Sequence, residues 1–336
     1  MRQSSNKRRI YKHLVKYHTR FSANSKMQPL SKLPFDEITE DAVKLVYKEL
    51  GIEVEKLENC LKLVKEWLNC ETHLPKDVDE VLMKNFILGS KGNVERTKEK
   101  LEKYIIAKTR MTNIYSDRVP KDEEFSLYPL QKVVFISPKH TPDGNRILLC
   151  RLPDKDPTHF NHLNLARYFC LTLDLLLFHD TSVGYNFIYD AAGFSPNILP
   201  KFNLRLLKEV SELIYKTSPM RIKSIQLVND TATMSTIMNI GKAFMSQKLK
   251  DRISCVKMEE LSKMYPKDCL PIEYGGTAGK IDDGNNNLLE ILKENKDWCL
   301  KSEEPKLIGL IPDDKKNLYS FDDLSMNGSF RRLNVD

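Results

Sequence analysis

The sequence contains no run of 18 uncharged apolar residues, which is the minimum for a helix that crosses a bilayer. Its longest apolar stretch, residues 168–178, is shorter and includes Asp174. No secretory hydrophobic segment follows the start. The seven cysteines are odd in number and include no CxxC pair. This pattern predicts reduced, mostly buried thiols, and it argues against a disulfide framework or a zinc site.

Acidic residues are absent from residues 1–26, which carry eight Lys and Arg. Because the whole chain has a formal net charge of +7, residues 27–336 carry −1, so the basic excess gives no support for nucleic-acid binding. Three interpretations of the basic segment stay open: a mitochondrial presequence, a polybasic membrane-surface segment, or a tail without fixed structure. The last includes an upstream extension of the reading frame with Met27 as the alternative start. We assign no function to this segment and expect folding to survive without it.

Residues 36–110 show only helical patterns. We expect Asp36 to cap a first helix that ends at Gly51. A second helix is predicted from apolar residues at helical spacing, namely Val54, Leu57, Leu61, Val64 and Leu68. Residues 78–88 predict a third helix, and Asn93 should cap a fourth. Together these elements predict a small helical bundle.

From about residue 140 the pattern alternates between strands and helices. Strands are predicted at residues 147–152, 185–190, 222–228 and 254–257. Helices are predicted at residues 161–179, 203–215, 231–245, 259–264 and 287–300. Alternation of this kind predicts an α/β fold, with a mostly parallel sheet, flanking helices and right-handed crossovers. With 336 residues, the chain has room for about two domains.

Two segments were compared with enzyme motifs, and each lacks residues that the motif requires. Residues 275–280 resemble a phosphate-binding loop, but Tyr274 and Ile281 stand where a glycine and a hydroxyl residue are needed. A turn without a phosphate is therefore favoured. The nucleophile elbow of hydrolases is also missing, since Pro196 directly follows Ser195.

The histidines give no catalytic or metal pattern. His159 and His162 could form half of a metal site, but no third ligand is evident, and a capping or surface role is favoured. His179 is expected at a helix end, where it would offset the helix dipole. We therefore predict no catalytic residue, no metal and no cofactor.

The segment after Asn229 predicts an unusual amphipathic helix. Its apolar face consists of Met234, Ile237, Met238, Phe244 and Met245. Methionine-rich faces repack around varied partners, and the interior Gly241 costs about 1 kcal/mol relative to alanine. An ordinary α/β core would account for the other apolar faces of the chain. A soft, intrinsically weak helix at this place suits a movable lid.

Four segments carry a resemblance to a known family. They are residues 86–101 (FILGSKGNVERTKEKL), 187–194 (FIYDAAGF), 225–230 (IQLVND) and 270–276 (LPIEYGG). In this order and spacing they resemble the CRAL-TRIO lipid-binding family with its N-terminal helical domain, within the branch of tocopherol transfer and retinaldehyde-binding proteins. The resemblance implies a non-enzymatic carrier that encloses one hydrophobic ligand between a sheet and helices. A mobile gate helix, at about residues 229–248 here, would cover the ligand.

The resemblance also implies a division of the chain and a set of ligand contacts. The parts are a basic tail at 1–35, an N-terminal helical domain at 36–112, a CRAL-TRIO domain at 125–280, and a C-terminal helix and tail at 281–336. Ten positions carry over as ligand-binding: Leu163, Phe169, Leu173, Phe187, Tyr189, Val210, Leu213, Ile214, Met220 and Ile225. The apolar face after Asn229 supplies the gate. Candidate polar groups that orient the ligand are Tyr189, Thr172 and Cys170.

The same resemblance implies a phosphoinositide-binding patch beside the gate. Its four residues are Arg221, Lys223, Lys248 and Arg252. A solvated basic face is the simpler interpretation of these charges. The sequence departs from the family at Ala192, where an acid is usual, and near Ser90, where a basic contact is expected. Phe169 and Met220 add unusual bulk to the wall, so the ligand does not transfer by analogy.

The sequence as a whole predicts a cytoplasmic monomer that associates transiently with anionic membranes and exchanges one lipid-like ligand with them. Retinoid, tocopherol, sterol and phospholipid remain open as ligands. The alternative is a signalling or trafficking adaptor that senses phosphoinositide without transfer activity. The missing nucleophile elbow, dinucleotide loop and metal cluster argue against a hydrolase or dehydrogenase, and no nucleic-acid partner is expected.

Overall fold

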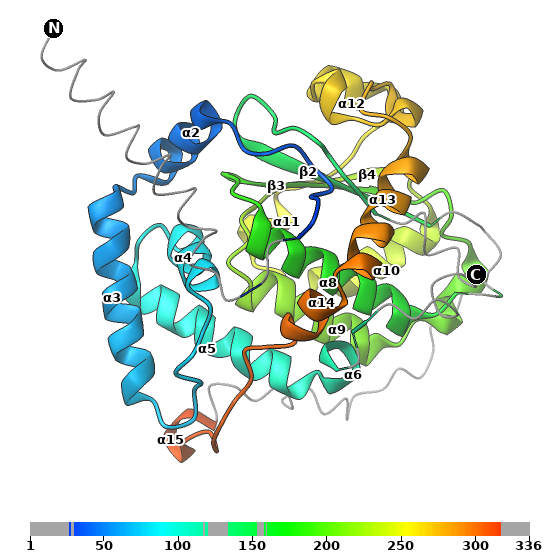
Figure 1. Ribbon diagram of the computed structural model, residues 1–336. Coiled ribbons are helices and arrows are strands. Elements are labelled where there is room, and N and C mark those ends of the chain that lie inside the picture. The colour runs from blue at the N-terminus through cyan, green and yellow to red at the C-terminus, as the bar shows by residue number, and fades with distance from the viewer. Residues whose placement is uncertain are drawn as a thin grey trace, which may run out of the picture.

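A computed structural model describes residues 27, 30–116, 118–119, 134–152, 158 and 160–316. The basic segment 1–26 and His159 lie outside the described residues. Figure 1 shows a group of helices on the left of the molecule and a sheet flanked by helices on the right. None of the helices in the described ranges is long and apolar enough to cross a bilayer.

The N-terminal helices form the predicted bundle. They are α2 (Glu40–Leu50), α3 (Val54–Cys70), α4 (Glu80–Gly89), α5 (Val94–Arg110) and α6 (Thr112–Tyr115). The predicted end of α2 is confirmed, since Gly51 adopts a left-handed conformation with φ 64°. The predicted cap of α5 is also confirmed, since the Asn93 side chain accepts the Arg96 N–H. The predicted cap of α2 is wrong, because Thr39 fills that role and the Asp36 N–H donates to the Pro138 carbonyl instead.

The sheet has five strands, which lie side by side in chain order. They are β1 (Val134–Ile136), β2 (Asn145–Arg151), β3 (Gly184–Asp190), β4 (Ile222–Val228) and β5 (Ile253–Cys255). Strands β2 to β5 are parallel, and only β1 runs antiparallel to its neighbour, β2. The predicted mostly parallel sheet is therefore confirmed. Strand β1 was not predicted, because three residues are too few for a pattern to emerge.

The remaining helices alternate with the strands and continue beyond them. The α-helices are α8 (His162–His179), α9 (Leu204–Glu212), α10 (Ala232–Lys242), α11 (Gln247–Lys250), α12 (Met258–Met264), α13 (Ile281–Glu294), α14 (Lys296–Lys301) and α15 (Asp313–Lys316). The 3₁₀ turns are η2 (Pro196–Lys201), η4 (Lys267–Cys269) and η5 (Ile272–Tyr274), and η3 (Leu213–Thr217) is a π turn that continues α9.

Two helix predictions differ from the structure in length. The helix predicted at 231–245 ends at Lys242, one residue after Gly241. The helix predicted at 287–300 is two helices, α13 and α14, broken at Asn295. The Asn295 amide donates to the Ile291 carbonyl, 2.7 Å away, and such local side-chain bonds compete with the helical ladder.

The two faces of the sheet have separate cores, because successive strand residues point to opposite sides. One face packs against α8 and α9 and presents Leu148, Cys150, Phe187, Tyr189, Ile225 and Leu227. The other packs against α12, η5 and α13 and presents Ile147, Leu149, Ile188 and Val228. The core beneath α8 and α9 is therefore separate from the core beneath α12, η5 and α13.

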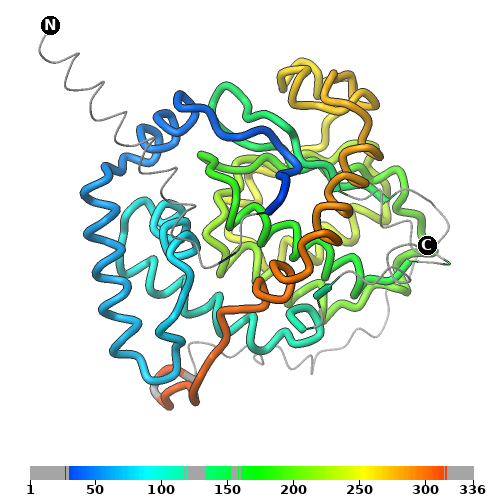
Figure 2. Tube along the Cα trace, viewed as in Figure 1, coloured from blue at the N-terminus to red at the C-terminus, as the bar shows by residue number. Residues whose placement is uncertain are grey.

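The bundle is docked closely on the α/β part. A Cβ atom at Gly89 would lie 2.2 Å from the Pro219 carbonyl oxygen, so the end of α4 touches the backbone before β4. The C-terminal segment joins the two parts a second time, because the Ile308 N–H donates to the His73 carbonyl. Figure 2 shows this orange-to-red segment running from α14 to the ends of α3 and α5.

We next compare the cysteines and histidines with what the sequence predicts for them. All seven cysteines are free, and only Cys70 and Cys255 are exposed. The capping or surface role expected for His162 is wrong: Asn161 caps α8, and the buried His162 accepts the Asn203 N–H at its Nδ1, 3.0 Å away, which joins α8 to the start of α9. The prediction for His179 is wrong: burial lowers its pKa to about 4, so the ring is neutral near pH 7 and has no charge with which to offset a dipole.

Candidate functional site

A cavity of about 160 Å³, called the main cavity here, lies between the sheet, α8, α9 and α10. It opens at the carboxyl ends of β2 and β3, where Cys150 and Tyr189 face it. Helix α8 contributes Leu165, Ala166 and Phe169. This is the place where ligands bind in open α/β sheets.

Helix α9 and the π turn after it present a continuous face to the cavity. The lining residues are Leu207, Val210, Ser211, Ile214 and Tyr215. Their spacing of three and four residues places them on one helical face. The helix starts where the Asn203 side chain accepts the Leu206 N–H at 3.0 Å. The cap and the spacing together position this wall.

Helix α10 covers the cavity. Four of the predicted gate residues line it, namely Met234, Ile237, Met238 and Met245, and Gly241 lies among them. The fifth, Phe244, is half-buried outside the lining, because the helix ends at Lys242 and the chain turns there. At its start, the Thr231 hydroxyl accepts the Met234 N–H at 3.1 Å and lies 3.2 Å from the Phe194 carbonyl, to which it donates.

Four of the ten predicted ligand-binding residues line the cavity: Phe169, Tyr189, Val210 and Ile214. The other six lie outside its lining: Leu163, Leu173, Phe187, Leu213, Met220 and Ile225. Phe187 shows why, since it precedes Tyr189 by two residues on β3 and stacks on it with 6.1 Å between ring centroids. The open space begins only at the strand ends, and residues farther along the same face are packed core.

The polar groups of the cavity converge at one end. Cys150 and Tyr189 are direct partners on β2 and β3, and the Tyr189 hydroxyl interacts with that of Tyr215 by a hydrogen bond. Ser211 lies one helical turn before Tyr215. Burial raises the pKa of Cys150 to about 12 and that of Tyr215 well above its usual range, so these groups are neutral at pH 7.

Sequence reasoning found only one of these polar groups, Tyr189. The other two candidates face elsewhere: the Thr172 hydroxyl donates to the Tyr168 carbonyl at 2.9 Å, and Cys170 is buried outside the lining. Ser211 and Tyr215 could have been found from the helical spacing that identifies Ile214. Cys150 could not, because its position follows from strand pairing.

Among the described residues, Arg151 is the one charged residue in the lining, and it directs its guanidinium away from the cavity. Because Cys150 points into the cavity, the next residue of β2 points to the opposite face of the sheet. There the Arg151 Nη2 lies 3.0 Å from the Asp282 carboxylate on α13. The described residues of the lining therefore present apolar and neutral polar groups to the cavity.

A group of basic residues lies at the other end of β4 and is called the basic cluster here: Arg96, Arg221, Lys223 and Arg252. Arg221 Nη1 is buried without a hydrogen-bond partner among the described residues. Burial, and then the charge of Arg252, lower the pKa of Arg221; Glu49 opposes this shift, and Arg96 adds to it. Burial and the Arg221 charge likewise lower the pKa of Lys223, with Asp143 and Glu49 in opposition. Because the net effect is a lowered pKa in both side chains, an anion bound here would relieve the remaining repulsion.

The basic cluster differs from the predicted patch in two residues. Arg96, on α5, was not predicted, because nothing in the sequence places the bundle beside β4. Lys248 was predicted, but it is exposed on α11 and is not among the charges that act on Arg221 or Lys223. Lys248 and Arg252 do not share a helix, since α11 ends at Lys250.

Arg221 and Lys223 do not alternate on one face of a regular strand. Strand pairing joins Tyr185 to Ile222 and Asn186 to Ser224, so the ladder skips Lys223 as a β-bulge. Arg221 lies just before β4. Bulges redirect side chains, and here the bulge brings Lys223 close to Arg221. Arg252 joins them because its guanidinium donates to the Ile222 carbonyl.

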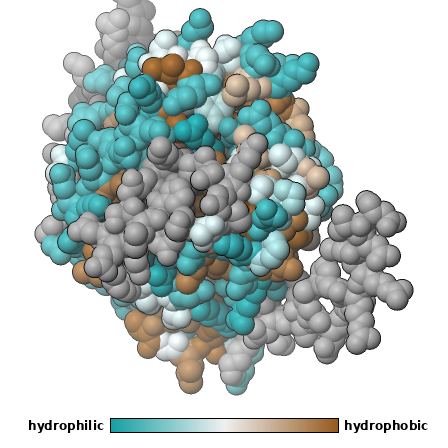
Figure 3. Space-filling view, turned by 90° about the vertical axis from the view of Figure 1, so that its right-hand side faces the viewer, coloured by the Kyte–Doolittle hydropathy of each residue, from teal (hydrophilic) through white to brown (hydrophobic). Residues whose placement is uncertain are grey.

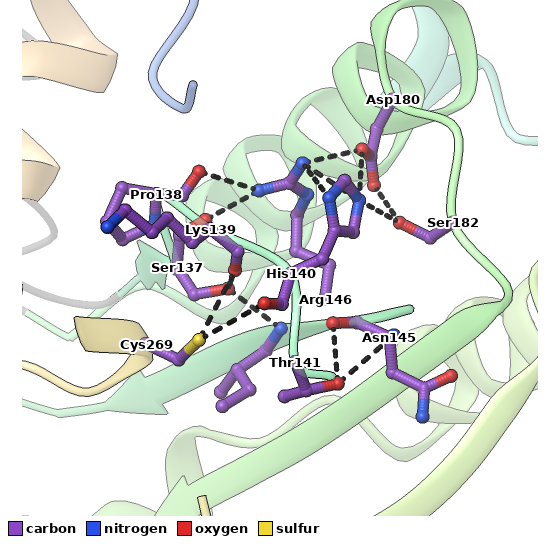
Figure 4. A network of polar contacts seen from close by, with 11 residues as sticks. Ser137, Pro138, Lys139, His140, Thr141, Asn145, Arg146, Asp180, Ser182 and Cys269 are labelled. Carbon is purple, nitrogen blue, oxygen red and sulfur yellow. Dashed lines mark hydrogen bonds and ion pairs between the residues drawn. The ribbon is translucent and has the colours of Figure 1, made fainter. Parts of the chain in front are cut away.

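A small cavity of about 40 Å³ adjoins Arg221, between α4, the end of α8 and the start of β4. The predicted wall residue Met220 lines this cavity. Asp180 and Ser182 belong to its wall and to the polar network in Figure 4. Burial would raise the pKa of Asp180, but Arg146, whose Nη2 lies 2.8 Å from it, and His140 lower that pKa below the usual range.

The network in Figure 4 contains Ser, His and Asp side chains but not in the arrangement of a hydrolase triad. His140 Nε2 faces both the Ser182 hydroxyl, at 2.9 Å, and the Asp180 carboxylate, at 3.2 Å. A triad uses one imidazole nitrogen for the nucleophile and the other for the acid. In addition, the Ser182 hydroxyl donates directly to Asp180 at 2.6 Å. This geometry is that of a structural ion-pair network around Arg146.

One group of potential metal ligands occurs in the part of the chain that the structure describes. Glu71, His73 and Glu102 place their ligand atoms within 4.8 Å of one another. The Lys315 ammonium already lies 3.0 Å from Glu71 and 3.1 Å from Glu102. A lysine of the C-terminal segment thus supplies the positive charge that these carboxylates require.

Comparisons with known proteins agree with this geometry. Residues 130–276 match the family model of the CRAL/TRIO domain. The matched segment contains every described residue that lines the main cavity. Residues 53–125, which include Arg96, match the Pinta-like, UBA domain.

Several relatives share much of the chain. The alpha-tocopherol transfer protein-like proteins of Mus musculus and Homo sapiens are 25% and 24% identical to it over 273 and 271 residues, covering 78% of each chain. Clavesin-1 of Xenopus laevis is 27% identical over 146 residues, 42% of this chain and 44% of that protein. A solved structure, the crystal structure of Sfh5, covers 72% of this chain and 89% of its own at 13% identity and a TM-score of 0.44.

Proposed function

We propose that this protein is a non-enzymatic carrier in the cytoplasm that binds one apolar ligand under α10 and exchanges it with membranes. The observation that carries the proposal is a cavity whose described walls are apolar or neutral and polar, closed by α10, which contributes Met234, Ile237 and Met238, and by Met245 just after that helix. Methionine side chains adapt to varied shapes. The chain would act as a monomer, because the cavity is built from one copy.

The lining sets the class of ligand. Burial keeps Cys150, Tyr189 and Tyr215 uncharged, and the Arg151 charge is directed to Asp282. A ligand with an ionised group inside the cavity would lose its hydration without gaining an ion pair. An apolar ligand with one hydroxyl or carbonyl group fits these walls. The similarity to alpha-tocopherol transfer protein-like proteins makes tocopherol the first ligand to test.

Ligand entry requires the cavity to enlarge. At about 160 Å³ it is close to the engineered cavity of about 150 Å³ that holds benzene, and smaller than the roughly 300–1,000 Å³ of drug-sized pockets. Movement of α10 would enlarge it with the least disruption, because this helix contains Gly241 and packs on η2 and α9 without being part of the sheet.

The basic cluster would dock the protein on phosphoinositide. The unpartnered Arg221 Nη1 and the lowered pKa values of Arg221 and Lys223 favour a polyanionic phosphate there. Attachment through such charges is reversible, and charge supplies much of its affinity. Figure 3 shows the right-hand side of Figure 1, where hydrophilic side chains are interrupted by separate hydrophobic patches.

The proposal is tested first by what the purified protein holds. Organic extraction and mass spectrometry should recover one apolar ligand per chain, or labelled tocopherol should bind with one-to-one stoichiometry. Transfer of that ligand between vesicles should then quicken when the acceptor vesicles contain phosphoinositide. Retention of neither endogenous lipid nor labelled tocopherol, together with no transfer, would overturn the proposal.

Docking is tested with a matched pair of variants. Arg221→Gln combined with Lys223→Gln should abolish the phosphoinositide-dependent part of transfer and leave ligand binding in solution intact. The control combines Lys62→Gln with Lys103→Gln, two lysines paired with glutamates on α3 and α5. It removes the same charge elsewhere and should keep the full phosphoinositide response.

The second candidate function is a phosphoinositide-sensing adaptor without transfer activity. The unpartnered Arg221 in the basic cluster favours it, because anion binding there does not depend on the main cavity. A protein that binds phosphoinositide vesicles but holds no lipid and transfers none would establish this alternative.

A further inference from the structure

Three sequence segments that are far apart in the chain meet at the carboxylate of Asp190. This side chain ends β3 and is 7% exposed. Its Oδ1 accepts the Ala192 N–H and the Asn229 side-chain amide, each at 2.9 Å, and its Oδ2 accepts the Tyr274 hydroxyl at 2.6 Å. We call Asp190, Asn229 and Tyr274 the hinge cluster, because of where Asn229 lies.

Asn229 is the residue at which the chain leaves the sheet for α10. Strand β4 ends at Val228, and α10 begins at Ala232 after its cap. Asn229 adopts a left-handed conformation with φ 51°, which is uncommon for a residue other than glycine. The hydrogen bond from its side-chain amide to Asp190 stabilises this conformation. A change in the backbone angles of Asn229 would redirect α10 and would also withdraw the amide from Asp190.

Tyr274 fixes the orientation of the Asp190 carboxylate. It is 3% exposed in the turn η5, where the next residues pack tightly: a Cβ atom at Gly276 would lie 1.8 Å from the Leu270 carbonyl oxygen. Burial and the neighbouring Asp190 raise the pKa of Tyr274, so its hydroxyl keeps the proton that it donates. With Oδ2 held by Tyr274, Oδ1 is directed at Asn229.

We infer that Asp190 is a positioning residue that holds α10 closed over the main cavity, acting through Asn229, and that the gate pivots at residues 229–231. The inference rests on the proposed function, since it assigns a role in ligand exchange. The hydrogen bond from Asn229 belongs to the closed position only. Movement of α10 about this point therefore requires that bond to break, and Asp190 sets how often it does.

The alternative is that the hinge cluster stabilises the sheet and has no specific effect on α10. A second tyrosine cluster on the same sheet supplies the matched control. The Tyr265 hydroxyl donates to the Gln226 side chain at 2.9 Å and lies 3.2 Å from the Ser224 hydroxyl. This cluster joins β4 to the segment after α12 and has no bond to residues 229–231. Tyr274→Phe and Tyr265→Phe each remove one hydrogen-bonded hydroxyl with little change of shape.

The experiment measures amide hydrogen exchange in α10 and the release rate of tocopherol labelled with nitrobenzoxadiazole. The variants are Asn229→Gly, which removes the amide but allows the left-handed backbone, Tyr274→Phe and Tyr265→Phe. We expect the first two to quicken exchange in α10, and release, by about tenfold, since a hydrogen bond to a charged group contributes at least the free energy of a factor of ten. Tyr265→Phe should leave both within about twofold of the parent at a similar loss of thermal stability.

Two outcomes overturn the inference. One is that exchange in α10 quickens no more in Asn229→Gly and Tyr274→Phe than in Tyr265→Phe. The other is that exchange quickens equally in all helices, which would indicate general destabilisation. Because hydrogen exchange needs no ligand, it tests the hinge cluster even if labelled tocopherol fails to bind. That failure would count against the proposed ligand and not against the pivot.

Discussion

Arg118 Nη1 lies 2.6 Å from Asp174 Oδ2, and both side chains are almost fully buried. Asp174 is the one acid in the apolar helix α8, and it also accepts the Tyr104 hydroxyl at 2.7 Å. The Lys108 ammonium, 3.9 Å away, donates to the carbonyls of Ser302 and Glu304. A single carboxylate therefore joins the bundle, the cavity helix and the C-terminal segment.

The buried ion pair between Arg118 and Asp174 predicts a large loss of stability when Asp174 loses its charge. Asp174→Asn should lower the free energy of unfolding by about 3–5 kcal/mol, because Arg118 would remain as a buried charge without its partner. Urea denaturation measures the difference. The control Asp41→Asn removes an exposed acid paired with Lys44 and should cost at most about 0.5 kcal/mol. Similar losses in the two variants would contradict a buried ion pair at Asp174.

The shape of the cavity predicts different effects for two tryptophan variants. Ile214→Trp should block ligand binding, since Ile214 lines the cavity and the larger ring would fill it. Leu173→Trp should leave the cavity open and instead lower stability by about 1–3 kcal/mol, because Leu173 is buried in packed core. Tocopherol binding and thermal unfolding are measured for both. Loss of binding in Leu173→Trp with normal binding in Ile214→Trp would show the cavity to be misplaced.

Two buried histidines predict a loss of stability in mild acid. Burial lowers the pKa of His162 and of His179 to about 4 each. Below about pH 6.5 the unfolded chain takes up protons that the folded chain refuses, so stability is full above that pH and falls towards pH 4. Each histidine contributes a loss of about 3 kcal/mol across this window.

His179→Phe isolates one of these contributions. The His179 Nε2 has no hydrogen-bond partner among the described residues, and its ring packs on Trp298 with 5.6 Å between centroids. Phenylalanine keeps this packing and does not titrate. The variant should therefore show a flatter decrease of unfolding free energy between pH 6.5 and 4, measured by urea titration at several pH values. An unchanged slope would show that His179 is charged in the folded state.

The basic cluster predicts a role for the helical bundle in anion binding. Arg96→Glu should weaken binding of inositol trisphosphate by about fivefold, in keeping with up to about 1 kcal/mol for an exposed charge pair. Lys98→Glu, two residues along α5 and paired with Glu95, makes the same charge change and should have little effect. Calorimetric titration at 0.1 M salt measures both, and higher salt should reduce the Arg96 effect. Equal weakening by the two variants would assign the effect to net charge alone.

Local patterns in the sequence were sufficient for the elements and for part of the cavity. Gly51 and Asn93 end and begin helices because turn and cap chemistry acts over a few residues. The methionines of α10 were found because helical spacing places Met234 and Met238 on one face. Leu173 and Phe187 were assigned to the wall through the family resemblance, and their apolar faces could not correct it, because such faces look the same whether they border a cavity or a packed core.

The sequence by itself determined the alternation of strands and helices, the soft helix α10 and the neutral character of the apolar wall, because these depend on residues close together in the chain. Only the tertiary structure decided which charges and hydroxyls meet. Arg96 reaches Arg221 because the bundle docks beside β4, and Lys223 joins them because a bulge redirects it. Asp190 reaches Tyr274 because their backbones, 84 residues apart, lie at the same end of the sheet. Contacts over such separations follow from packing and register, and no local pattern specifies them.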